Sequence, residues 1–186
     1  MIGFYLASLN RLPQYSEFAV DLASISGATA AETFARRAAF ANAFVLRNEF
    51  VNGSTESPGY GSMSNTTYVT TLMGHYSLSS ITTPDPANPD GNTKVTLTTA
   101  DLINRLNAAT LTRAQVLRAI VQSDEAVGIE ALNVFVASQY YGYLRRTPDT
   151  SGFNGWKNYL VAHPTDFRTM VNGFVNSIEY RLRFGP

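Results

Sequence analysis

Apolar residues recur at a spacing near 3.6 along most of the chain, and strand-like alternation is scarce. This spacing places the apolar side chains on one face of a helix. Hydroxyl residues suited to capping helix N-termini stand at Thr99, at Thr112 with Gln115 three positions later, and at Thr165. The pattern predicts an all-α fold with helical segments at residues 4–25, 30–51, 99–107, 112–122, 127–145, 152–162 and 165–182.

Two stretches between these segments are rich in turn-forming residues. Asn-Gly and Ser-Pro-Gly turns interrupt residues 51–67, and three prolines with an Asp-Gly pair interrupt residues 77–98. Both compositions predict surface loops. The run at residues 94–98 alternates polar and apolar side chains, which predicts a short strand or an extended arm there.

The helix ends share a register around three glutamates. Two apolar residues stand five and four positions before each glutamate, and a third stands nine positions before it. Such recurrence at helix ends indicates an internal repeat, since one helical pattern alone does not require it. The matching sets are Phe40, Phe44, Val45 and Glu49; Val116, Ile120, Val121 and Glu125; and Met170, Phe174, Val175 and Glu179.

An arginine followed two positions later by proline is the second recurring feature. It occurs at Arg11 and Arg146, each with a tyrosine six positions earlier, whereas the middle copy has Pro84 without the arginine. We therefore expect repeated helical-hairpin units that form a compact bundle, with an irregular, loop-rich insertion in the middle unit. The expected units are a degenerate first copy at 1–60, a second at 61–127 with the inserted loop at about 76–98, and a third at 128–186.

The recurring charges suggest structural ion pairs. Arg11 would pair with Glu49, and Arg146 with Glu179, fixing how two helices cross while adding little net stability. The alternative is that these charges lie separately on solvated faces.

The third unit carries a longer motif. Residues 141–156 read YGYLRRTPDTSGFNGW, and residues 174–180 read FVNSIEY. This combination resembles the DUF4214 family, which has a tyrosine-rich helix, a Gly-Arg-x-Pro-Asp-x-x-Gly turn, a tryptophan and a Ser-x-Glu-aromatic helix end. Arg145 stands where the family usually has glycine. The resemblance implies an all-helical module, similar to the phycobilisome-linker domain, that recurs in bacterial secreted and surface proteins and has no established catalytic residue.

The composition of the chain excludes several kinds of partner and site. The 186 residues include 14 basic and 14 acidic side chains and no cysteine. The neutral balance argues against nucleic acid as a partner, and the missing thiols exclude disulfides and a cysteine nucleophile. No apolar run is long enough for a membrane span, so membrane insertion is not expected. Ser, Thr and Asn outnumber the charged residues, which favours a secreted or cell-surface protein, although no signal peptide is recognised in this chain.

The sequence carries no recognisable catalytic motif. The spacings of a zinc protease, a serine hydrolase elbow and a phosphate-binding loop are absent. The glutamates of the repeat are better explained by structural roles. Several aromatic residues could instead form a recognition surface for a protein or a glycan, although helical spacing favours core packing for most of them. These are Tyr140, Tyr141, Tyr143, Trp156 and Tyr159.

Oxygen ligands crowd the middle loop, at Asp85, Asn88, Asp90 and Asn92. The spacing does not fit an EF-hand, which leaves an irregular Ca²⁺ site or, as we favour, a solvated turn without any cofactor. We therefore expect a non-catalytic interaction or structural module with a protein or glycan partner. The alternative is a glycan-active enzyme or accessory domain that uses an acidic residue in an aromatic cleft.

Overall fold

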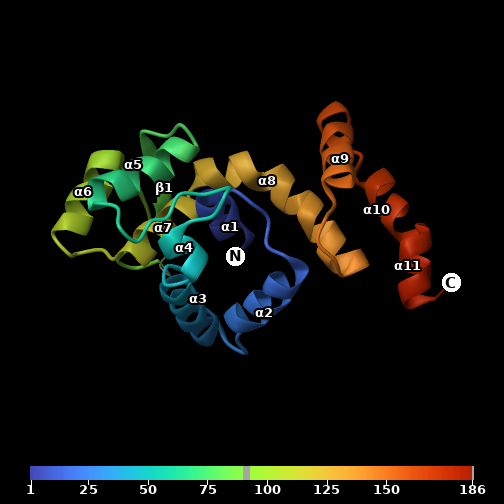
Figure 1. The fold of residues 1–186 in the computed structure, drawn as a ribbon, viewed down its shortest axis with the longest axis horizontal. Coiled ribbons are helices and arrows are strands. Elements are labelled where there is room, and N and C mark those ends of the chain that lie inside the picture. The colour runs from blue at the N-terminus through green and yellow to red at the C-terminus, as the bar shows by residue number, and fades with distance from the viewer. Residues whose placement is uncertain (90–92, 186) are drawn as a thin grey trace. The chain divides into compact units, whose positions relative to one another are not determined.

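The computed structural model describes residues 1–89 and 93–185, and within them the regular secondary structure is helical apart from one two-stranded sheet. The fold class is all-α, as the apolar spacing predicted. The chain divides into two compact units (Figure 1). The first comprises Met1–Arg11 and Val20–Ile129, and the second comprises Leu12–Ala19 and Glu130–Pro186. Two of the three expected repeat copies thus fall in one compact unit, and the third copy forms most of the other.

The first unit is built around α7 (Arg113–Val121), which contacts α1, α3, α5, α6 and β1. Its remaining elements are α1 (Ile2–Leu9), most of α2 (Tyr15–Ile25), α3 (Ala30–Phe44), α4 (Asn48–Asn52), α5 (Asn65–His75), β1 (Ser80–Pro84), β2 (Lys94–Thr98), α6 (Thr99–Asn107) and the start of α8 (Asp124–Gln139). α7 takes the central position because five of its nine residues are apolar and almost fully buried.

The second unit contains the rest of α8, a π-helical turn η1 (Tyr140–Leu144), α9 (Thr150–Ala162), α10 (Phe167–Val175) and α11 (Ile178–Phe184). Its core is formed by side chains of α8, η1, α9 and α10: Val136, Tyr140, Leu144, Leu160, Met170 and Phe174. The segment Leu12–Ala19, which includes the first residues of α2, belongs to this unit, because the ring of Phe18 stacks on Tyr141 at 4.2 Å and the Tyr141 hydroxyl donates to the Pro13 carbonyl oxygen at 2.6 Å.

Three segments with continuous apolar spacing in the sequence are each two helices. Residues 4–25 break after α1, where Asn10 has a left-handed backbone with φ of 53° and Pro13 cannot donate to a helical hydrogen bond. Residues 30–51 break at Val45, and residues 165–182 break at Asn176. Apolar spacing continues across such breaks, since both helices present a face to the same core, and spacing alone therefore misses them.

The predicted helix caps are partly correct. Thr112 and Gln115 form the reciprocal capping box that the sequence indicated. α6, however, is capped by Thr98 with Asp101 instead of Thr99, and α10 by Asp166 instead of Thr165. In both cases neighbouring residues offer similar oxygen atoms, and the backbone turn decides which of them lies near the free amide groups.

The middle insertion is more regular than expected. β1 and β2 form an antiparallel hairpin in which Ser80 pairs with Thr98 and Pro84 with Lys94. β2 matches the predicted strand, whereas β1 was interpreted as loop. The sequence concealed β1 because its buried positions are Ile81 and Thr83, and a threonine on the inner face hides the apolar alternation. The Thr83 hydroxyl is nevertheless satisfied, since it donates to the Ala119 carbonyl oxygen at 2.9 Å.

α5 was missed altogether. Its sequence, NTTYVTTLMGH, is rich in β-branched residues, which are weak helix formers. Burial of Tyr68, Val69, Leu72 and Met73 outweighs that preference, because each of these side chains is at most 1% exposed.

The turn before Arg146 stores backbone strain. Arg145 has φ of 48°, in the left-handed region that costs a non-glycine residue about 1–2 kcal/mol. We expect Arg145→Gly to raise the free energy of unfolding by about 0.5–1 kcal/mol, part of the relief being lost with the Arg145 contact on the Phe184 ring. Denaturant titration measures the effect. Arg145→Ala is the matched control, because it removes the same contact and keeps the strain, and equal stability of the two variants would contradict the prediction.

Candidate functional site

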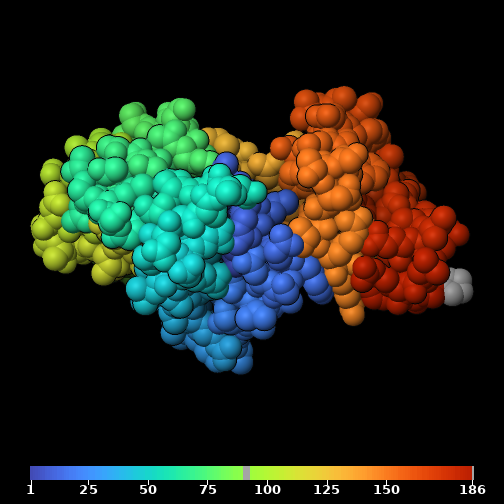
Figure 2. Space-filling view, in the orientation of Figure 1, coloured from blue at the N-terminus to red at the C-terminus, as the bar shows by residue number. Residues whose placement is uncertain are grey.

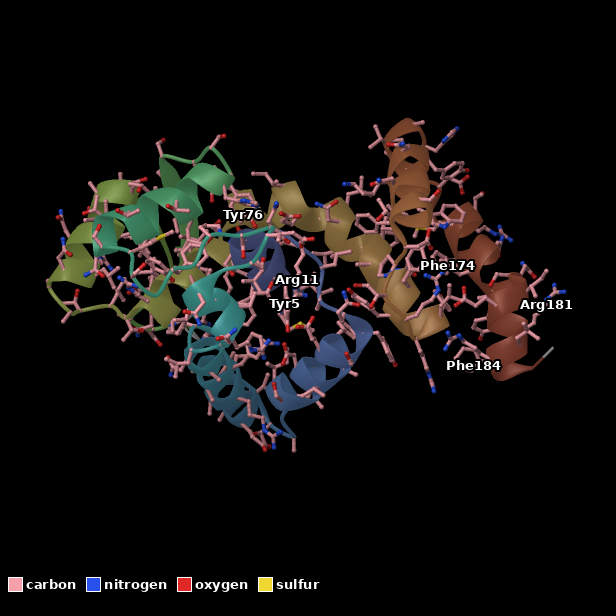
Figure 3. The ribbon with its side chains drawn as sticks, viewed as in Figure 1. Tyr5, Arg11, Tyr76, Phe174, Arg181 and Phe184 are labelled. Carbon is pink, nitrogen blue, oxygen red and sulfur yellow. The ribbon has the colours of Figure 1, made fainter. Side chains whose placement is uncertain are left out.

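The glutamate of the first repeat copy is held by an arginine. Arg11 Nε lies 2.9 Å from Glu49 Oε1, and Arg11 Nη2 lies 2.6 Å from Glu49 Oε2, so the contact is bidentate. The same guanidinium lies over the Tyr5 ring at 5.1 Å (Figure 3). This cluster joins the end of α1 to α4, and neither side chain is left to approach a substrate.

The third copy repeats this arrangement. Arg146 Nε lies 2.7 Å from Glu179 Oε1, and its guanidinium lies over the Tyr140 ring at 5.1 Å, the same distance as in the first copy. The hydrogen bond with Glu179 raises the pKa of Arg146. Arg146 Nη1 also reaches Asp149, which caps α9 by accepting the Gly152 amide hydrogen. That backbone bond lowers the pKa of Asp149.

The middle copy keeps its glutamate without an arginine. Both carboxylate oxygens of Glu125 accept the amide hydrogen of Thr82, at 3.1 and 2.9 Å. Thr82 stands two positions before Pro84, which is the position that arginine occupies in the other copies. Burial acts to raise the pKa of Glu125, but the hydrogen bonds from Thr82 and from the backbone of Glu125 itself together outweigh it, and the pKa is lowered. A backbone donor on β1 thus replaces the guanidinium.

Two of the apolar positions of the repeat are buried in all three copies. Phe44, Ile120 and Phe174 are all buried, and so are the residues four positions earlier. Phe44 meets the Tyr5 ring edge-on at 5.2 Å, and Phe174 meets the Tyr140 ring edge-on at 4.8 Å. The repeated residues therefore form the same aromatic and charged cluster at both ends of the repeat.

A serine marks the helix break in two of the copies. The Ser123 hydroxyl donates to the Ile120 carbonyl oxygen and accepts the Ala126 amide hydrogen. Ser177 makes the same two bonds, to Phe174 and Tyr180. Each hydroxyl bonds a carbonyl group in the last turn of one helix and an amide group in the first turn of the next. In the sequence, such a break is marked by a serine that stands three positions after the residue whose carbonyl it contacts and three positions before the residue whose amide it accepts.

The first copy has Arg47 at the serine position, and the sequence analysis missed its role. Arg47 Nη2 lies 2.6 Å from Asp21 Oδ1, and the Tyr5 hydroxyl donates to Asp21 Oδ2 at 2.7 Å. Asp21 is only 4% exposed. Although burial opposes it, the hydrogen bond with Asp21 raises the pKa of Arg47. The sequence signal was that arginine replaces serine at a repeated position. It did not reveal the partner of Arg47, because Asp21 on α2 has no equivalent in the other copies.

Two of the predicted aromatic recognition residues are unavailable to a ligand. Tyr140 and Tyr141 are 3% and 2% exposed, because both rings belong to the interior of the second unit. Tyr143, Trp156 and Tyr159 are half-buried. Tyr143 and Trp156 both stack on Phe174, and the Tyr159 hydroxyl donates to Asp166 Oδ2. Their faces serve mainly to build the core.

Half of the proposed calcium ligands lie in the part of the chain that the structure describes. Asp85 Oδ1 accepts the Ala87 amide hydrogen, and the Asn88 amide donates to the Asp85 carbonyl oxygen, so these residues form a local turn. Asp90 and Asn92 lie outside the described residues. Within residues 1–89 and 93–185, no three His, Cys, Asp or Glu side chains gather in a way that could hold a metal ion.

A cavity of about 230 Å³ lies in the first unit, between α3, α7 and the segment after β1. Prolines and alanines form its apolar walls. Its polar groups bond to one another, since Gln115 Oε1 accepts the Thr112 amide hydrogen and Arg118 Nε donates to Gln122 Oε1. The described lining includes no carboxylate and no aromatic ring, so it differs from the acidic, aromatic cleft of the enzyme alternative.

The outer surface of α11 has a different character. Ile178 and Leu182 are 77% and 82% exposed, and they are four residues apart on one helical face. The opposite face carries Tyr180 and Phe184, whose rings lie 4.9 Å apart. Figure 3 shows Arg181 and Phe184 on opposite sides of this helix, and Figure 2 shows α11 at the surface of the second unit. Two large aliphatic side chains therefore face solvent on a helix anchored from behind.

Among the described residues, none of the helices combines the length and the apolarity that crossing a membrane requires. No family model, curated protein or solved structure matches the chain.

Proposed function

We propose that the chain is a non-catalytic helical interaction module of a bacterial secreted or cell-surface protein, and that it binds its partner through exposed aliphatic side chains. The observation that carries this proposal is the exposure of large aliphatic residues on short, well-anchored helices. Single exposed apolar residues are common on protein surfaces, but two on one face of a seven-residue helix leave that helix with an uncovered apolar stripe. In the second unit this pair is Ile178 and Leu182, which are 77% and 82% exposed.

The arrangement of the acidic residues supports a non-catalytic role. A general acid needs a pKa raised toward neutrality and access to the substrate. Glu49 and Glu179 are instead engaged by arginines, and Glu125 by a backbone amide that lowers its pKa. Each glutamate ties one helix to another element of the same unit. We assign these three residues a scaffolding role.

The DUF4214 resemblance and the extracellular location belong to the same proposal. Support for the resemblance comes from the turn after Arg146, where Asp149 caps α9 and Arg146 reaches Glu179. Support for the location comes from the lysine-poor, hydroxyl-rich composition.

Replacing the three repeat glutamates tests whether these residues have a structural or a catalytic role. We expect Glu49→Gln, Glu125→Gln and Glu179→Gln each to lower the melting temperature at neutral pH, because each removes a carboxylate that accepts hydrogen bonds in the folded chain. Circular dichroism melts measure this. The exposed Glu56 provides the matched control, and Glu56→Gln should leave the melt unchanged.

The loss of stability in Glu125→Gln is also expected to depend on pH. Because the folded pKa of Glu125 is lower than its ordinary value of 4.5, its contribution to stability is fully present above that pH and is lost as the pH falls through the folded pKa. The difference between wild type and Glu125→Gln should therefore close in acid. Polysaccharide hydrolysis by the wild type that any of these three substitutions abolishes without changing the melt would establish the enzyme alternative.

A further inference from the structure

We propose that the outer face of α11, formed by Ile178, Arg181 and Leu182, is a docking surface for an acidic amphipathic helix of a partner protein. This inference rests on the proposed interaction function and adds the chemical class of the partner. Its two components are an aliphatic stripe and an excess of positive charge around that stripe.

The helix that exposes the aliphatic stripe is held in place by contacts on its other side. Tyr180 and Phe184 face the opposite way, and Tyr180 meets the Tyr143 ring at 6.3 Å. Glu179 anchors the first turn through Arg146. These contacts hold α11 against η1 and α10, so Ile178 and Leu182 stay exposed without any need for the helix to rearrange. A partner that covers both side chains gains hydrophobic free energy without an ordering cost in α11.

The charges beside the stripe are mostly positive. α11 itself carries Arg181 and Arg183 against the single acid Glu179. That acid is already engaged, because Arg146 lies 2.7 Å and Arg183 3.4 Å from its Oε1 atom. The charged side chains of the helix that presents Ile178 and Leu182 therefore carry a net positive charge, whereas the whole chain is neutral.

These two components define the partner. Aliphatic residues spaced four apart on a short helix match a helix that carries its own apolar residues at three- and four-residue intervals. The surrounding arginines favour Asp or Glu beside those apolar residues and disfavour Lys or Arg. An anionic membrane is a weaker fit, since a seven-residue helix with two exposed aliphatic side chains buries little apolar surface in a bilayer.

Synthetic peptides test the inference directly. The probes are two fluorescein-labelled helical peptides of about 18 residues, long enough to populate the helix. Both carry leucines at the same heptad positions, and all charged positions are glutamate in one and lysine in the other. Fluorescence anisotropy with the full chain should show at least about tenfold tighter binding of the glutamate peptide. Raising the salt concentration should weaken that binding.

Variants of the full chain locate the site. The double variant Ile178→Ser with Leu182→Ser should abolish binding, and it should fold normally because both side chains are exposed. Arg181→Glu with Arg183→Glu should reverse the preference toward the lysine peptide. Val161→Ser is the matched control, because Val161 is a similarly exposed aliphatic residue on α9, and it should bind the glutamate peptide as the wild type does.

The outcomes distinguish this inference from the proposed function. Equal binding of both peptides, or binding that the α11 variants leave unchanged, overturns the docking surface. If the α11 serine variant instead abolishes self-association in sedimentation, or binding to phosphatidylserine vesicles, the partner class is wrong and the interaction function stands. If the peptides, the vesicles and a second copy all fail to bind, both proposals fail.

Discussion

Asp21→Ala is expected to lower the free energy of unfolding by about 3 kcal/mol, the low end of the range for breaking a buried ion pair. Asp21 is 4% exposed and accepts hydrogen bonds from both Arg47 and the Tyr5 hydroxyl. Its removal leaves a guanidinium without its main partner and a fully buried phenol without its acceptor. Arg47 is 32% exposed, so solvent can recover part of its charge, which keeps the expected loss at the lower end.

Urea titration followed by circular dichroism measures this change. Glu56→Ala is the matched control, because Glu56 is an exposed acid and its loss should leave the titration midpoint unchanged. The double variant Asp21→Ala with Arg47→Met should recover part of the stability, since it removes the stranded charge as well. If Asp21→Ala unfolds at the wild-type midpoint, the cluster of Tyr5, Asp21 and Arg47 contributes nothing to the free energy of unfolding.

Phe174→Ala is expected to cost about 3–5 kcal/mol in the second unit, the usual range for deleting a buried ring. Phe174 is 3% exposed, and it contacts Tyr140, Tyr143 and Trp156 at ring-centre distances of 4.8, 6.0 and 5.8 Å. All three rings lose packing contacts when it is removed. The cavity that remains has large, rigid neighbours that cannot collapse fully into it.

The chain's single tryptophan reports on this position. Trp156 stacks on Phe174, so its fluorescence should shift to the red in Phe174→Ala and its urea midpoint should fall. Phe167→Ala is the control, because Phe167 is 46% exposed and its ring meets Phe135 instead of the Phe174 cluster. An unshifted emission with an unchanged midpoint would mean that Phe174 does not support the core.

The repeat was the part of the scaffold most accessible from the sequence. Arg146 and Glu179 lie 33 positions apart, yet their pairing followed from comparing two copies in which the same residues recur at related spacings. The buried positions Phe44, Ile120 and Phe174 were found in the same way. A repeat constrains three-dimensional placement because each copy must build the same cluster to bury its own apolar face.

The candidate interaction surface could not be found in this way. Ile178 and Leu182 have the same spacing as the buried Met170 and Phe174, so periodicity places all four on apolar helix faces. Their different exposure arises because the chain breaks at Asn176 and α11 turns Tyr180 toward the Tyr143 ring instead. Likewise, the sequence left a recognition role open for Tyr140 and Tyr141 while favouring core packing, and burial places both in the interior.

The sequence by itself determined the helical class, the repeat, the capping box at Thr112 and the partners of Arg11 and Arg146, because these depend on residue type and spacing. Only the tertiary structure decided that Asp21 meets Arg47, that Thr82 replaces an arginine beside Glu125, and which apolar side chains face solvent. These features depend on helix breaks and on packing between distant segments. Such contacts are set by the free energy of the whole folded unit, which local spacing does not encode.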